Sequence, residues 1–200
     1  MAQLTGTPQA FHNDTSLADS SQRGELGRRA WDTSGNEYVY LQGTASTVAG
    51  DWAVYDENYG TERLVANEVG PVGIAMAAIV ADSFGWYQVY GVNTTARTDT
   101  IAADSSLYID GTAGRVDDLG VAGDLVIGAY SMTADTSNVA TVSLNYPTVS
   151  NDLGSGGSAT PGGANTNVQF NDSGSFGGDP DFTFNSATGT VTAVGFRVGT

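Results

Sequence analysis

Short runs of aromatic and β-branched residues, separated by turn-forming residues, make up the hydrophobic pattern between residues 24 and 149. Runs of this length and composition predict strands. The clearest alternation covers residues 140–146, where Ala, Val, Leu and Tyr alternate with Thr, Ser and Asn until Pro147 closes the run. A period of two is typical of a strand with one buried face, so the expected fold class is all-β.

Roughly eight short strands are expected in this region, a density typical of a small β-sandwich or barrel. The sequence leaves the choice between these two architectures open. It also leaves open whether Val72–Ala81 is a buried strand or a short helix, because a continuous apolar run fits both. The other expected strands are Tyr38–Leu41, Trp52–Tyr55, Arg63–Ala66, Trp86–Val92, Leu107–Ile109, Leu125–Met132 and Ala140–Tyr146.

One tetrapeptide occurs twice: Val48-Ala49-Gly50-Asp51 is repeated as Val121-Ala122-Gly123-Asp124. Each copy leads directly into an expected strand. Gly supplies the unusual φ of a tight turn, and the Asp side chain can accept hydrogen bonds from nearby backbone amides. We therefore expect two equivalent turns, although four shared residues do not carry the inference of a duplicated half-domain.

Changes in the pattern divide the chain into four parts. Residues 1–22 lack sustained periodicity and predict an extended N-terminal arm, either packed on a neighbouring subunit or disordered. Residues 23–150 hold the main β domain. Residues 151–166 are rich in Gly, Ser and Thr, which predicts a flexible linker. Residues 167–200 form a short C-terminal module.

The C-terminal module has three strand-like runs, Val168–Phe170, Phe182–Phe184 and Thr190–Val194, with turns expected at 172–174, 177–178 and 188–189. Three short strands bury too little apolar surface to be stable alone. The module is therefore expected to oligomerise, and identical copies around a symmetry axis are the simplest partners.

The charge balance narrows the range of partners. The chain has 22 acidic residues against seven Lys and Arg, a net charge of −15, and all seven basic residues are Arg. This composition argues against binding to nucleic acid or to an anionic membrane surface. Mutual repulsion between copies explains the acidity; adaptation to salty surroundings is the alternative.

Several classes of chemistry and targeting are excluded or not expected. The chain has no Cys, which excludes disulfides and thiolate chemistry. The N-terminus has neither the basic start nor the apolar run of a signal peptide. The longest apolar stretch is about half the length that a membrane span requires.

Candidate chemical groups are few, and we predict no catalytic, metal or cofactor site. His12 is the sole histidine and lies in the expected arm, which disfavours a Ser/His/Asp triad. Asp117-Asp118 and Asp179-Pro180-Asp181 offer carboxylates of the kind that Ca²⁺ prefers, but without EF-hand spacing, so they are interpreted as acidic turn residues. The glycines at 154–157 lack the strand, helix and Lys of a phosphate-binding loop.

The aromatic residues allow a second interpretation. Trp52, Trp86 and Tyr87 are expected to pack in the core and across strands. The alternative is a sugar-binding face formed by aromatic side chains of the main domain, with Trp86 as the residue to test.

Two segments resemble known proteins. The first resemblance covers residues 24–146 and is carried by Gly24–Gly27, Glu37–Leu41, Ala49–Asp51, Gly73–Ala75, Gly85–Gly91 and Ala122–Gly128. These segments, with a central GWYQVYG run and a later GD-apolar-apolar-apolar-G run, resemble tailed-bacteriophage capsid decoration (cement) proteins. The resemblance implies a protein that binds the outer capsid at symmetry axes, commonly as a trimer, and stiffens the shell.

The second resemblance is carried by Asn167–Gly178 and Phe182–Asn185. These residues look like a segment of phage tail fibres and other trimeric virion appendages. Here the chain extends only to Thr200, so the resemblance implies a short trimeric β knob, or a socket for another protein, instead of a long fibre.

The leading hypothesis is a non-enzymatic structural virion protein without a cofactor. It would be made in the host cytoplasm and would bind the major capsid protein as a homotrimer, with the C-terminal module facing outward toward another virion protein, a host-surface glycan or nothing. One alternative is a head- or tail-fibre component that binds host-surface glycans. Another is a polysaccharide-cleaving enzyme, since any two of the acidic residues can meet in space. The sequence identifies neither the host nor the capsid axis.

Overall fold

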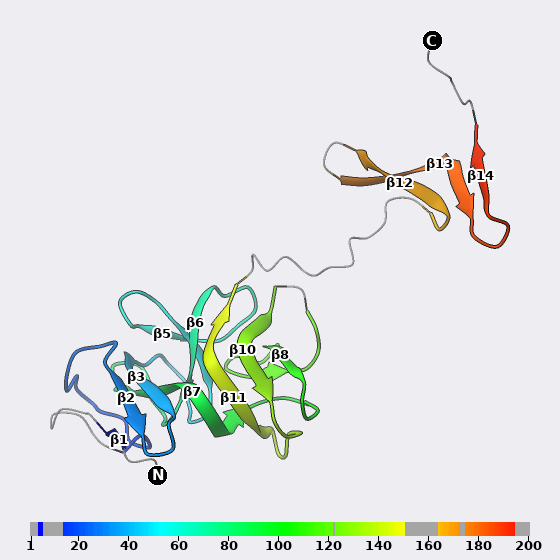
Figure 1. The fold of residues 1–200 in the computed structure, drawn as a ribbon. Helices are drawn as coiled ribbons and strands as arrows, with labels where there is room; N and C mark the ends of the chain where they lie inside the picture. The colour runs from blue at the N-terminus through cyan, green and yellow to red at the C-terminus, as the bar shows by residue number, and fades with distance from the viewer. Residues whose placement is uncertain (1–3, 6–13, 122, 151–163, 173–174, 195–200) are drawn as a thin grey trace. The chain divides into compact units, whose positions relative to one another are not determined.

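The computed structural model describes residues 4–5, 14–121, 123–150, 164–172 and 175–194. The chain divides into two units between Gly154 and Ser155, within the expected linker (Figure 1). Every regular element of the described residues is a β-strand, which confirms the all-β class. These residues include no helix long and apolar enough to cross a membrane. His12 and residues 151–163 lie outside the described residues.

The first unit is built from one large antiparallel sheet. Its strands are β1 (Leu4–Thr5), β2 (Arg29–Asp32), β3 (Glu37–Gln42), β4 (Trp52–Tyr55), β5 (Thr61–Arg63), β6 (Gly70–Ala75), β7 (Phe84–Arg97), β8 (Ser106–Ile109), β9 (Val116–Asp117), β10 (Leu125–Ser131) and β11 (Val139–Val149).

The strand order is β1-β2-β3-β7-β6-β11-β10-β8-β9, and β4 pairs with both β5 and β6. β7 reaches several partners because it has 14 residues. Its first half pairs with β3 and β6, and its second half pairs with β11. The sheet does not close into a barrel, so the barrel alternative is not the observed architecture.

Two neighbouring strands are buried on both faces. Tyr38 and Tyr40 of β3 pack with Trp86 in one core cluster, whereas Val39 and Leu41 pack with Tyr87 in a second cluster. The continuous apolar runs at 38–41 and 86–89 have this origin, because a strand covered on both sides needs no polar face. A third and larger cluster, around Trp52 and Leu144, joins β4, β6, β8, β10 and β11.

Most expected strands are confirmed, with four informative differences. Val72–Ala81 is a strand only as far as Ala75, where β6 ends. Arg63–Ala66 coincides with β5 only at Arg63. β2 and β9 are short strands that the hydrophobic pattern did not predict.

The fourth difference lies at Pro147, which was expected to end a strand but lies inside β11. Proline cannot donate to a ladder, so it is tolerated where pairing is interrupted. The register of β10 and β11 shifts at this point, between Ile127 and Ala129, and three residues of β11 oppose Gly128 alone. Pro147 therefore occupies a bulge.

The two copies of the repeated tetrapeptide form the same turn. Asp51 N donates to Val48 O and Asp124 N donates to Val121 O, each at 3.2 Å. Gly50 and Gly123 have φ values of 87° and 88°. In both turns a Gly with positive φ precedes the Asp whose amide closes the turn, a position that favours Gly.

The two turns differ in what their aspartates bind. Asp51 has no exposed side-chain surface, and it pairs with Arg63 of β5 and Arg97 of β7 at 2.9 Å and 2.5 Å. Its Oδ2 also accepts the Val48 amide at 3.0 Å. Asp124 instead accepts the Asn67 amide at 3.2 Å. One buried carboxylate thus ties two distant strands to the start of β4.

The described part of the N-terminal segment packs on the rest of the first unit. β1 pairs with β2 through Leu4 and Thr5. Asp19 is buried, exchanges two backbone hydrogen bonds with Phe84 and accepts the Tyr40 hydroxyl at 2.8 Å. Arg23 forms an ion pair with the same carboxylate. Residues 14–23 thus contribute to covering the Tyr40–Trp86 cluster of their own chain.

The second unit is a three-stranded antiparallel sheet of β12 (Asn167–Asp172), β13 (Ser175–Asn185) and β14 (Thr190–Ala193), in that order. All three expected strands are present. The turn expected at 177–178 is wrong, because both glycines pair with β12 inside β13. The turn expected at 188–189 is confirmed between β13 and β14.

Replacing Asp51 by Asn is expected to destabilise the first unit by about 3–5 kcal/mol, because two partly buried guanidinium groups lose their counter-charge. Asp124→Asn is the matched control, since Asp124 occupies the equivalent turn but accepts a backbone amide and forms no ion pair with an arginine of the described residues. Urea unfolding at neutral pH measures both variants. Equal losses would show that the turn, and not the ion pairs, carries the stabilisation.

Alkaline pH is expected to weaken the first unit through Tyr87. Burial raises the pKa of Tyr87 from 10.0 to about 12, and Thr61 only partly opposes this shift. The folded state therefore holds the phenolic proton more tightly than the unfolded state. This stabilisation is complete below about pH 10 and is lost as pH rises toward 12.

At about pH 11 the loss through Tyr87 is about 1 kcal/mol. To measure this loss, the unfolding free energies of the wild type and of Tyr87→Phe are compared at neutral pH and at about pH 11. The variant should show a smaller decline, although not a flat profile, because burial also raises the pKa values of Tyr38 and Tyr40. Identical declines in both proteins would contradict the assignment to Tyr87.

Candidate functional site

The aromatic residues singled out in the sequence are core residues. Trp52, Trp86 and Tyr87 are at most 1% exposed. The core interpretation is confirmed, and a sugar-binding face built on Trp86 is wrong, because its ring is not accessible. A Trp86→Ala variant would test folding instead of binding.

The acidic pairs accept hydrogen bonds from backbone amides. Asp117 accepts the Leu119 amide at 3.0 Å, and Asp179 accepts the Asp181 amide at 2.8 Å. Asp118 accepts the Ala102 amide at 2.8 Å. Burial and neighbouring aspartates raise the pKa of Asp117. No group of three His, Cys, Asp or Glu side chains among the described residues is arranged to hold a metal ion.

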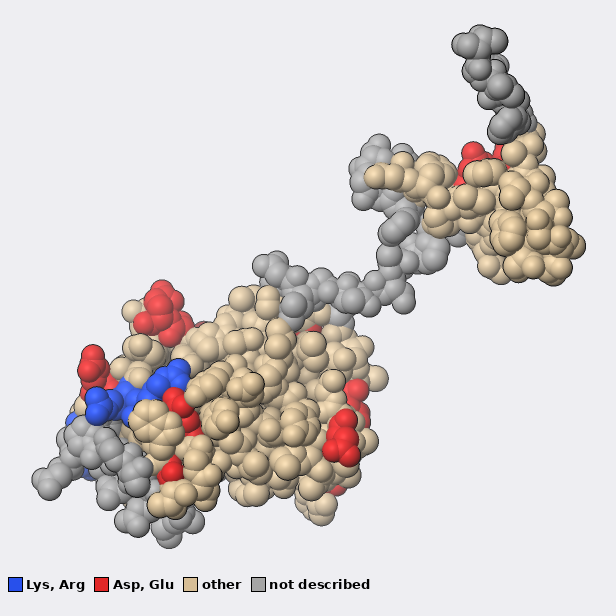
Figure 2. Space-filling view, in the orientation of Figure 1, with Lys and Arg blue, Asp and Glu red and all other residues tan. Residues whose placement is uncertain are grey.

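An uncharged face covers the outer side of β7, β11 and β10. Val92, Ser143 and Tyr130 are directly opposite one another on these three strands, so their side chains form a row. Figure 2 shows a broad tan area over β10 and β11, with acidic side chains near its borders. We call this the uncharged face and define it by Val92, Tyr130, Met132, Val139, Thr141 and Ser143.

A cluster of charged and aromatic side chains lies beside this face. Glu37 is buried, and its Oε1 lies 2.5 Å from Arg29 Nη1. The Tyr146 hydroxyl donates to Glu37 Oε2 at 2.7 Å. The Tyr146 ring stacks on Tyr90 with 5.3 Å between centroids, and the Arg29 guanidinium lies 5.6 Å from the Tyr146 centroid. Arg29, Glu37, Tyr90 and Tyr146 are called the Glu37 cluster.

Irregular backbone brings this cluster together. Tyr90 pairs with Glu37 on one side and with Asn145 on the other. Gly91, Gly128 and Tyr146 all have positive φ, at 95°, 79° and 48°. A positive φ is uncommon for tyrosine, and such strain persists only where the surroundings fix it. Sequence reasoning missed the cluster because no local pattern marks residues that meet only through bulges.

The electrostatics of the cluster are those of a compensated ion pair. Burial disfavours the charged Arg29, but the hydrogen bond and charge of Glu37 outweigh it and raise the pKa of Arg29. Hydrogen bonding to Glu37 raises the pKa of Tyr146, and burial raises that of Tyr55. The Glu37 carboxylate thus stabilises the charged form of Arg29.

A hollow of about 260 Å³ opens beside the Glu37 cluster. Val72 and Val89 lie buried beneath it, and Arg29 and Thr148 bring polar groups to it. The full lining is Arg29, Tyr55, Pro71, Val72, Val89, Tyr146, Pro147 and Thr148.

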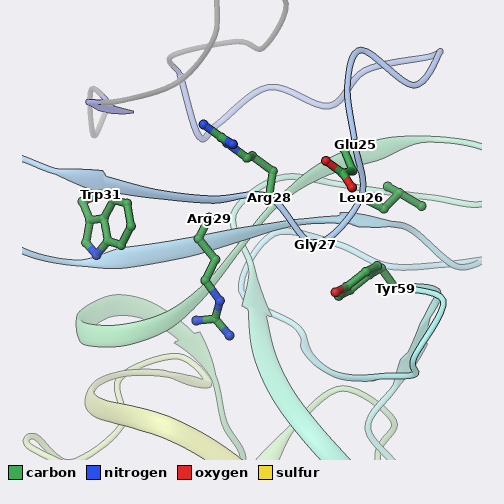
Figure 3. Close-up of a pocket in the computed structure, with 7 residues that line it drawn as sticks. All are labelled: Glu25, Leu26, Gly27, Arg28, Arg29, Trp31 and Tyr59. Carbon is green, nitrogen blue, oxygen red and sulfur yellow. The ribbon is translucent and has the colours of Figure 1, made fainter.

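A larger groove of about 480 Å³ runs along β2. Figure 3 shows that Arg28 and Arg29 project to opposite sides of the strand, so the two guanidinium groups do not converge on one ligand. The ring of Tyr59 packs on Gly27, where an added Cβ would lie 2.2 Å from a ring carbon. The groove is therefore shaped by packing of Tyr59, without a focus of polar groups.

The second unit has one apolar face. Phe182 is opposite Ala193 and Phe184 is opposite Val191, so all four side chains lie on the same side. Phe182 and Phe184 remain 41% and 44% exposed. We call these four residues the phenylalanine face.

A double-mutant cycle between Tyr146→Phe and Glu37→Gln tests whether the Glu37 cluster is a coupled unit. The hydroxyl–carboxylate hydrogen bond is expected to give a coupling energy of about 1 kcal/mol in unfolding experiments. A matched cycle between Tyr130→Phe and Glu37→Gln should give none, because Tyr130 lies on β10 outside the cluster. Zero coupling in the first cycle would contradict the hydrogen bond.

No family model matches this chain, and neither does any curated protein or solved structure in the comparisons.

Proposed function

We propose that this chain is a structural virion protein that decorates a tailed-phage capsid as a homotrimer. Its first unit binds the outer surface of the major capsid protein, and its second unit forms a small outward knob. The resemblance of residues 24–146 to capsid decoration proteins motivates the capsid as partner. The observation that carries the proposal is the pair of exposed, uncharged surfaces, one on each unit.

The uncharged face supports binding of the first unit to another protein surface. Burying a charged side chain without a partner is costly, and charged residues are depleted at the centres of interfaces. In a chain with a net charge of −15, a face of Val, Thr, Ser, Tyr and Met side chains over three strands is the surface that is least costly to bury. The acidic residues outside this face make neighbouring copies repel one another and so oppose aggregation.

The phenylalanine face supports self-association of the second unit. Its phenylalanine side chains remain 41% and 44% exposed among the described residues of the unit, and three strands of this size are not stable alone. Identical copies are the partner of matching chemistry, because their faces are equally apolar and uncharged. In an assembly with closed rotational symmetry, the apolar face of every copy is covered. The resemblance of Asn167–Asn185 to trimeric appendages favours an assembly of three copies.

In this role the protein needs no catalysis and no cofactor. A bound trimer stabilises a shell because its interface area must be lost before the capsid opens. The knob is free to contact another virion protein or a host-surface glycan. The place of action is the outer capsid surface, after synthesis in the host cytoplasm.

The decisive experiment is mass spectrometry and imaging of purified particles of the virus that encodes this chain. The proposal predicts symmetric copies on the outer capsid. Ser143→Asp, in the middle of the uncharged face, should reduce the copy number at least tenfold, whereas Ser34→Asp, in the exposed turn between β2 and β3, should not. Particles that lack the wild-type protein would refute the function.

Self-association through the phenylalanine face has its own test. The full-length chain should sediment at about three times its 20.6 kDa mass. Phe184→Asp introduces a charge on that face and should shift the protein to the monomer. Thr183→Asp, the adjacent position on the opposite side of β13, should leave the trimer intact. A trimer that survives Phe184→Asp would place the contact elsewhere.

A further inference from the structure

The hollow beside the Glu37 cluster combines apolar and hydrogen-bonding surfaces in a way that the core does not require. Val72 and Val89, each 1% exposed, lie beneath its surface, so a ligand would not reach them. The apolar surface that a ligand can reach is formed by the rings of Tyr55 and Tyr146 and by Pro71. A core-filling role would bury Tyr146, yet its side chain is 49% exposed.

The position of Tyr146 is fixed from several directions. Its backbone has a φ of 48°, its hydroxyl donates to Glu37, and its ring stacks on Tyr90. An exposed aromatic side chain held this firmly loses little conformational entropy when a ligand binds, which favours recognition. Strained backbone that presents a fixed side chain is typical of ligand sites.

The charges of the hollow favour a neutral ligand. Glu37 neutralises Arg29 through their 2.5 Å contact. An anionic ligand would compete with Glu37 and with the chain's net charge of −15, and a cation would meet Arg29. The guanidinium has five N–H groups, and only Nη1 is used in the Glu37 contact, so donors remain for neutral oxygen acceptors. The Thr148 hydroxyl adds a group that both donates and accepts.

The size of the hollow limits the ligand to one ring. Its volume is about 260 Å³. Pockets that bind drug-sized ligands are larger, at about 300–1,000 Å³. A pyranose has apolar C–H faces that pack on aromatic and aliphatic side chains and equatorial hydroxyls that pair with Arg, Thr and Tyr.

We propose that this hollow is a binding site for a single neutral pyranose, such as the terminal unit of a polysaccharide. Tyr55 and Tyr146 contact the C–H faces of the sugar, and Arg29 and Thr148 hydrogen-bond its hydroxyls. The site is formed within the first unit alone, so it does not depend on trimer formation or on capsid binding.

The test is a titration of the full-length protein with methyl α-glucoside, methyl α-mannoside, methyl β-galactoside and N-acetylglucosamine, followed by NMR. At least one neutral sugar should shift signals of the hollow. Tyr146→Ala should weaken binding of that sugar at least tenfold. Tyr130→Ala should leave its binding unchanged, although Tyr130 is equally exposed at 48%. Glucuronate should bind at least tenfold more weakly than the best neutral sugar.

Thr148→Val provides a second variant that keeps side-chain shape, for the case in which Tyr146→Ala does not fold. It should weaken binding of the sugar several-fold without changing the unfolding midpoint, since the Thr148 side chain is exposed. The proposal is overturned if no sugar of the panel binds, if glucuronate binds best, or if Tyr130→Ala weakens binding equally. Capsid attachment, measured separately, decides the proposed function without affecting this result.

Discussion

The buried carboxylate of Asp51 is the constraint on which the first unit depends. It meets Arg63 and Arg97, which lie 12 and 46 residues away along the chain. Arg63 also donates to Ala113 O at 2.6 Å, and Trp52 Nε1 donates to Arg97 O at 3.1 Å. The start of β4, the end of β5, the end of β7 and the loop before β9 thus share one set of hydrogen bonds.

Such a network contributes little net stability, but it favours one packing of the strands over the alternatives. Desolvation of the charges offsets much of their attraction, but an alternative packing that leaves Asp51 without its arginines would be strongly disfavoured. The surrounding backbone fits the same arrangement. Gly114 has a φ of 77°, and a Cβ there would lie 2.8 Å from the Asp51 carboxyl carbon. The start of β4, the end of β5 and the end of β7 are therefore held together at one point.

Irregular backbone within the strands also shapes the surfaces available for binding. β7 changes partners along its length, and the kink at Gly91 is held by Asn36, whose Oδ1 accepts the Val92 amide at 2.9 Å. Beyond the kink, one side of β7, β11 and β10 faces outward and forms the uncharged face. At the kink, the bulge of β11 presents Tyr146 beside Arg29 and Glu37. Two surfaces of different chemistry, one broad and one small, thus lie next to each other.

The sequence by itself determined the fold class, the division of the chain and most strands, because these follow from local alternation and turn chemistry. Gly50 and Gly123 even predicted two equivalent turns correctly. Local pattern did not predict β2 and β9, the continuation of β11 through Pro147, or the pairing of Gly177 and Gly178 inside β13.

Only the tertiary structure decided which aromatic residues are accessible. Trp86 and Tyr146 look alike as aromatic residues in strands, yet one fills the core and the other is half exposed. The difference comes from sheet register and bulges, which are set by contacts between residues far apart in the chain. For the same reason the Glu37 cluster, assembled from β2, β3, β7 and β11, leaves no trace in the sequence, whereas the linker and the two β regions do.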